Sequence, residues 1–171
     1  CLLEGEICEC IESTPLEIDS IGRYSDLAFD TNRGIAWVSA YEEDHGDLVV
    51  GRVDQEGNIK WYWVDGVPAD APIIAAPSGP RGGVDEAGVN VGQHTSLTLG
   101  QDGTIHVAYL DVENSKLKYA MGIASVDGEL SWTIMSLDAG GAIGTAEADR
   151  VMGEGAGWWT DITLDQQGRP C

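Results

Sequence analysis

Residues 92–110, GQHTSLTLGQDGTIHVAYL, decide the fold. Two runs in which apolar and polar residues alternate flank a turn at residues 101–103. In the second run, Ile105, Val107 and Tyr109 fall on one face of the chain, as they do in a strand that is buried on one side. A Gly-containing turn between two such runs is typical of a β-hairpin.

The same pattern occurs three times in the chain. It begins as GRYSDL at Gly22, as GQHTSL at Gly92 and as GWWTDI at Gly157. In the first two copies the similarity continues through an acidic Gly turn into a segment that contains tryptophan, Trp61 or Trp132. We therefore expect a repeat protein whose units each hold four short antiparallel strands joined by tight turns.

The repeat divides the chain into six segments. These are an irregular, cysteine-rich leader at 1–21, a first unit at 22–65, a connection at 66–91, a second unit at 92–138, a Gly-rich connection at 139–156 and the start of a third unit at 157–171. In the second unit we expect strands near 93–99, 104–110, 116–123 and 129–137.

A repeated four-stranded meander predicts an all-β domain of the β-propeller type, in which each unit is a blade. Two blades and the start of a third do not close a ring, so we expect a longer polypeptide or a second chain to complete it. The alternative is a compact β-sandwich in which the third segment pairs with the N-terminal region.

The charge of the chain restricts its partners. Nine basic and 29 acidic residues give a net charge of −20, which disfavours nucleic acid and anionic membranes as ligands. No apolar run approaches the roughly 20 residues of a membrane-spanning helix. The acidic residues are spread along the chain, which favours a solvated surface.

One acidic stretch, EEDHGD at 42–47, is a candidate metal site. Its carboxylates, on Glu42, Glu43, Asp44 and Asp47, are the oxygen ligands that calcium prefers. A solvated hairpin loop is the other interpretation. Apart from calcium at this stretch, we expect no cofactor.

The four cysteines are Cys1, Cys8, Cys10 and Cys171. They lack the spacing of zinc or haem motifs, so they predict disulfides and an extracytoplasmic location, either secreted or at the cell surface. Cys171 is expected to pair with Cys8 or Cys10, or with a partner chain. Cys1 resembles the lipidated first residue of a mature bacterial lipoprotein, which would anchor the chain to an outer membrane. The alternative is a trimmed fragment in which Cys1 is an ordinary disulfide partner.

Residues 94–111, HTSLTLGQDGTIHVAYLD, and 116–122, KLKYAMG, resemble the repeats of large secreted or lipid-anchored bacterial propeller proteins. The resemblance covers most of 22–64 and 92–137 and continues over 157–171. It implies an extracytoplasmic propeller of a kind whose activity is often unknown.

Residues 125–132, SVDGELSW, are similar to the Asp-box of sialidase-type propellers, Ser-x-Asp-x-Gly-x-Thr-Trp. The glycine stands one position early and Ser131 replaces threonine. The similarity implies a structural role, in which the aspartate binds turn amides and the tryptophan packs in the blade, and it implies no glycosidase activity. The structural residues that we expect in the blades are Asp127, Trp132, Trp61, Gly92 and Gly157.

Residues with the potential for chemistry are scattered. No predicted turn or strand brings several arginines together, as a sialidase-like site requires, and no Gly-x-Ser-x-Gly motif is present. His94 takes the place of Tyr24 and Trp159 in the repeat, which predicts packing rather than metal binding. Trp158 and Trp159 belong to blade packing or to a surface that stacks on sugars or docks a protein.

These observations predict a non-catalytic, extracytoplasmic binding or structural module of a cell-surface protein or assembly. Its expected partners are another protein, further blades of the same polypeptide, or a glycan. One alternative is a fragment of a glycan-active, sialidase-like enzyme. Another is a subunit of an extracellular filament or appendage.

Overall fold

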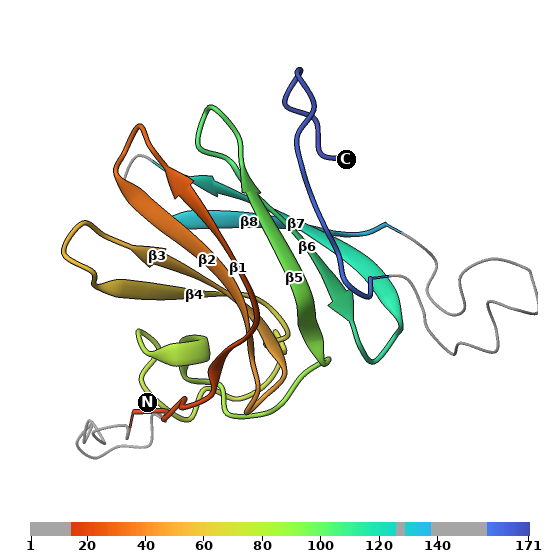
Figure 1. Cartoon of the computed structure of the whole chain (residues 1–171). Coiled ribbons are helices and arrows are strands. Elements are labelled where there is room, and N and C mark those ends of the chain that lie inside the picture. Colours follow the sequence, from red (N-terminus) through yellow and green to blue (C-terminus); the bar gives the residue numbers. More distant parts are fainter. Residues whose placement is uncertain (1–14, 126–128, 138–156) are drawn as a thin grey trace, which may run out of the picture.

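The computed structural model describes residues 15–125, 129–137 and 157–171 (Figure 1). Two four-stranded antiparallel sheets form most of it, each with its strands in sequence order. The first sheet contains β1 (Ile21–Asp30), β2 (Ile35–Glu42), β3 (Asp47–Val53) and β4 (Ile59–Asp65). The second contains β5 (Val91–Leu99), β6 (Ile105–Asp111), β7 (Lys116–Ala124) and β8 (Leu130–Ser136).

The prediction of an all-β chain is confirmed. The described residues include a single short 3₁₀ helix, η1 (Pro80–Gly83), which lies in the connection between the sheets. In this part of the chain no helix has the length and apolar character needed to cross a membrane. The observed strands of the second sheet begin and end within two residues of the expected positions.

Aspartates hold the turns between strands. In Asp30, Asp54 and Asp102, the Oδ1 atom accepts a hydrogen bond from a backbone amide two residues further along, at distances of 3.0, 3.1 and 2.9 Å. This local bond closes the turn and satisfies an amide that the strand ladder leaves unpaired. The polar Gly turns of the sequence therefore become hairpin turns.

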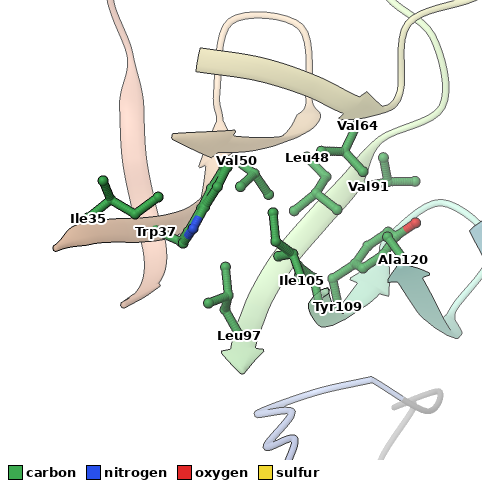
Figure 2. Close-up of a cluster of buried hydrophobic side chains, with 11 residues drawn as sticks. Ile35, Trp37, Leu48, Val50, Val64, Val91, Leu97, Ile105, Tyr109 and Ala120 are labelled. Atoms are coloured by element: carbon green, nitrogen blue, oxygen red, sulfur yellow. The ribbon is translucent and has the colours of Figure 1, made fainter. Parts of the chain in front are cut away.

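The core lies between the two sheets (Figure 2). Side chains from β2 and β3, including Trp37 and Leu48, face side chains from β5 and β6, including Leu97 and Tyr109. Leu48 and Tyr109 are completely buried. Full burial of one such side chain contributes about 1.5–3 kcal/mol, so this layer joins the sheets.

The sheets are closest at their first strands. β1 lies against β5, whereas the outer strands β4 and β8 make few contacts, so the sheets diverge from their inner to their outer strands (Figure 1). At the inner strands, Asp26 Oδ2 accepts hydrogen bonds from the Leu97 amide at 2.7 Å and from Ser96 Oγ at 3.1 Å. These bonds fix the position of the second sheet relative to the first.

Residues 163–171 form a further hairpin. Thr163 and Cys171 exchange two backbone hydrogen bonds of 3.1 and 3.0 Å. This pairing is equivalent to that of Thr98 with His106 in the second sheet. Cys171 therefore occupies the position of His106, as the repeat predicts.

The third segment packs on the second sheet. Ile162 contacts Ala108 and Tyr119 on the face of this sheet that points away from the first sheet. Within the described residues this segment pairs with itself. The sandwich alternative pairs it with the N-terminal region, of which residues 1–14 lie outside the described residues. The described strands form two open sheets and do not close into a ring.

Trp61 and Trp132 each lie over a glycine on the neighbouring strand. Trp61 pairs with Gly51 and Trp132 pairs with Gly122. A Cβ atom built on either glycine would lie 2.8 or 2.5 Å from the indole ring. The missing side chain therefore makes room for the ring.

Candidate functional site

Four aromatic side chains from the three repeats meet at one end of the inner strands. Tyr24, His94 and Trp159 occupy equivalent positions, and their ring centroids lie 4.4 Å apart for Tyr24 and His94 and 5.2 Å apart for His94 and Trp159. Trp158 lies 5.0 Å from His94. We call these four residues the aromatic row.

The backbone of the row is unusual and recurs in every repeat. The φ angles of Tyr24, His94 and Trp159 are 52°, 51° and 49°. Residues other than glycine seldom adopt this left-handed conformation. It costs of order 1–3 kcal/mol and persists only where the surroundings enforce it. A conformation that returns three times at equivalent positions indicates that the stacking of the units imposes it.

The glycine that opens each repeat allows the units to approach. Gly92 and Gly157 have φ angles of 99° and 103°. A Cβ atom on Gly92 would lie 2.7 Å from Leu48 Cα, and one on Gly157 would lie 3.1 Å from Leu110 Cα. Both glycines therefore lie against the backbone of the preceding unit.

Two hydroxyls at equivalent positions link successive units beside the row. Thr95 Oγ1 donates a hydrogen bond of 2.8 Å to the Tyr24 carbonyl. Thr160 Oγ1 donates the equivalent bond to the His94 carbonyl. Ser25, at the same position in the first unit, is exposed. The structural role predicted for these recurring hydroxyls is therefore seen at the two places where the structure describes a preceding unit.

The row is open to solvent. Trp159 is 71% exposed, and Tyr24 and Trp158 are each 39% exposed. A shallow hollow of about 250 Å³ lies along it, and its lining consists of aromatic rings and hydroxyl side chains. The residues that line it are Tyr24, Ser25, His94, Thr95, Trp159 and Thr160.

His94 lies at the centre of the row as a neutral ring. Burial lowers its pKa below the usual value of histidine. Its Nε2 atom is covered and has no hydrogen-bond partner in the protein. Packing between aromatic neighbours, as the repeat predicted, accounts for these properties.

The four carboxylates proposed for calcium have different partners. Glu42 Oε1 accepts the Asp44 amide at 2.6 Å, and Glu43 pairs with Arg23 at 2.7 Å. Asp44 accepts backbone amides of the segment before β1. In the part of the chain that the structure describes, no group of three or more His, Cys, Asp or Glu side chains is placed to hold a metal ion. Calcium stays a prediction.

Asp47 instead forms a buried ion pair with Arg81. The Arg81 Nε and Asp47 Oδ2 atoms lie 2.6 Å apart, and both side chains are fully buried. Burial raises the pKa of Asp47, and the Arg81 guanidinium partly offsets this effect. Arg81 also donates to the carbonyls of Val84 and Glu86, so it fixes the connection 66–91 against the start of β3.

The described arginines that form ion pairs are separated from one another, each with its own carboxylate. The pairs are Arg23–Glu43, Arg33–Asp30, Arg81–Asp47 and Arg169–Asp165. A sialidase-like site would instead need several arginines that converge on one carboxylate of a ligand.

The remaining candidate residues are only partly described. Cys171 is exposed and its thiol is free in this structure. Cys1, Cys8, Cys10 and Asp127 lie outside the described residues. The disulfide, the lipid anchor and the Asp-box turn therefore stay predictions.

Apolar side chains at equivalent positions differ in their exposure. Leu97 and Ile162 each face the preceding unit and are 5% and 9% exposed. Leu27, their equivalent in the first unit, is 61% exposed. The first sheet therefore has an open apolar face, to which Phe29 also belongs.

The second sheet has an open region on its opposite face. A hollow of about 370 Å³ there is mostly apolar, and Met135 and Leu137 in its lining are 45% and 55% exposed. Val64, which takes the place of Leu137 in the first unit, is covered by the second sheet and is only 8% exposed.

Comparison of the chain with protein-family models, with curated protein sequences and with solved structures finds no match. The likeness to bacterial propeller repeats therefore rests on the sequence motifs alone.

Proposed function

We propose that the chain is a non-catalytic binding or structural module of a cell-surface protein or assembly, and that the aromatic row is its ligand-binding surface. The observation that carries this proposal is the row itself. Equivalent residues of three repeats bring their rings together, and the largest ring, that of Trp159, is the most exposed. The four cysteines and the resemblance to secreted repeats support a location outside the cytoplasm.

We further propose that the two sheets are successive blades of a propeller-type domain. The relation between the first and second units recurs between the second and third. Leu97 and Ile162 each bury against the unit before them, and Thr95 and Thr160 each donate to the equivalent carbonyl. A relation that repeats in this way is what an array of blades requires.

The chemistry of the row favours binding over catalysis. Its rings provide packing surface, the exposed Ser25 side chain offers a hydroxyl, and burial favours the neutral form of His94. A catalytic acid or base needs a titratable group that reaches the ligand. The covered Nε2 atom of His94 does not provide one.

A second candidate function, that of an assembly subunit, is favoured by the open sheet faces. Leu27 and Phe29 are 61% and 58% exposed on the first sheet. Their equivalents in the second sheet, Leu97 and Leu99, pack into the core between the sheets. A partner that presents an apolar sheet face would cover this surface in the same way.

Stability measurements on Trp159→Ala test the proposed binding role without knowledge of the ligand. An exposed ring that serves a ligand contributes little to folding, so we expect the free energy of unfolding to fall by less than about 1 kcal/mol in urea titrations. A loss of more than about 2 kcal/mol would mean that the row is structural.

Hydrolysis of aryl sialosides or other aryl glycosides by the chain would instead support the enzyme alternative.

A further inference from the structure

We infer that the aromatic row binds a neutral carbohydrate, a chain of hexopyranose units, and this inference rests on the proposed binding role of the row. It names the class of ligand, which the proposed function leaves open.

The lining of the row matches the two kinds of surface that a sugar offers. A pyranose ring has faces made of C–H groups, which pack on aromatic rings, and a rim of hydroxyls, which exchange hydrogen bonds. The hollow along the row offers the rings of Tyr24, His94 and Trp159 beside the exposed side chain of Ser25. The hydroxyls of Thr95 and Thr160, which also line it, are already bonded within the protein. Amphipathic aromatic rings of this kind are common where one side of a contact is apolar and the other is wet.

Apolar ligands fit the row less well. The six residues of its lining are aromatic or carry a hydroxyl, and none is aliphatic. The hollow beside Met135 and Leu137 differs, because its lining also contains the aliphatic side chains of Leu117, Leu137 and Ile162 and the side chain of Met135. A lipid or an apolar peptide segment would find its match at that second hollow rather than at the row.

The charge of the chain selects against acidic sugars. A net charge of −20 creates a field that repels anions, and no cation lies among the residues that line the hollow. Polymers of uronic acids or sialic acids are therefore disfavoured, and neutral hexoses remain.

The row is held in place before any ligand arrives. The hydrogen bonds from Thr95 and Thr160 fix the carbonyls of Tyr24 and His94, and ring contacts join His94 to both tryptophans. A surface that is already ordered loses less conformational entropy on binding. Trp159 has the largest exposed ring, so its loss should weaken binding most.

Affinity gel electrophoresis of the native chain tests the inference. The gels would contain hydroxyethyl cellulose, glycogen or laminarin as neutral probes, and polygalacturonate as the anionic probe. We expect retardation by at least one neutral polymer. Trp159→Ala should weaken this binding by about tenfold or more, as expected when a binding surface loses its most exposed aromatic ring.

Phe29→Ala is the matched control, because Phe29 is an aromatic residue that is 58% exposed outside the row, on the open face of the first sheet. It should bind like the native chain. The inference is overturned if no neutral polymer retards the chain, if only polygalacturonate does, or if Trp159→Ala and Phe29→Ala bind alike. If the free energy of unfolding of Trp159→Ala is close to that of the native chain, any of these three results rejects the sugar as the ligand. The binding role of the row then stays in place.

Discussion

At the scale of single residues, His106 is buried and His94 is half-buried, and burial disfavours the charged form of both rings. Burial lowers the pKa of His94 and of His106. His106 Nδ1 lies 2.7 Å from the Tyr119 hydroxyl, while the Nε2 atom of His94 has no partner in the protein. A proton on either ring would lose solvation, so the folded chain resists protonation at both positions.

This resistance predicts a loss of stability at mildly acidic pH. The unfolded histidines bind protons near pH 6.5, whereas the folded ones bind them only at lower pH. Their contribution to stability is therefore present above about pH 6.5 and is lost as the pH falls through the folded pKa values. The unfolding free energy of each protein would be measured by urea titration at pH 7 and at pH 5. The change between the two pH values should be smaller for His94→Gln than for the native chain. Equal differences would contradict the assignment.

Several residues could be placed from the sequence alone. Cys171 falls at the position of His106 because the turn residues and the spacing of the repeat fix the hairpin register. The equivalence of Tyr24, His94 and Trp159 could also be read from the repeat. Their gathering into one exposed row could not, because it depends on how whole units stack.

At the scale of elements, the connection 66–91 is tied to the first sheet through one side chain. Arg81 lies in a segment, SGPRGG, that reads as a Gly-rich loop, and Asp47 reads as part of an acidic turn. The two are 34 residues apart in sequence. No local pattern relates them, and so the ion pair could not be read from the sequence.

Arg81→Met should be strongly destabilising. It leaves the carboxylate of Asp47 buried and unpaired, which costs about 3–5 kcal/mol of unfolding free energy. Arg23→Met is the matched control, because the side chains of Arg23 and Glu43 are 65% and 46% exposed and such pairs contribute about 0–1 kcal/mol. Equal losses in urea titrations of the two variants would show that Arg81 does not hold the connection. The double variant Arg81→Met, Asp47→Leu should recover part of the loss.

At the scale of the whole molecule, the same relation joins successive units. Opening glycines, recurring hydroxyls and apolar residues at equivalent positions all contact the unit before them. The alternation of strand residues and the turn chemistry were enough to predict the sheets. The way in which the sheets stack could not be read from one sequence, since the contacts between units lie about 70 residues apart (Asp26 to Leu97, for example, is 71).

One series of substitutions measures this stacking most directly. Leu27→Ala, Leu97→Ala and Ile162→Ala change equivalent positions that are 61%, 5% and 9% exposed. If every unit buries this side chain against the one before it, Leu97→Ala and Ile162→Ala should each lower the free energy of unfolding by about 2–5 kcal/mol. Leu27→Ala should lower it by less than about 1 kcal/mol, because no described unit covers it. Similar losses at all three positions, measured by urea titration of the chain at low concentration, would contradict the stacking of equivalent units.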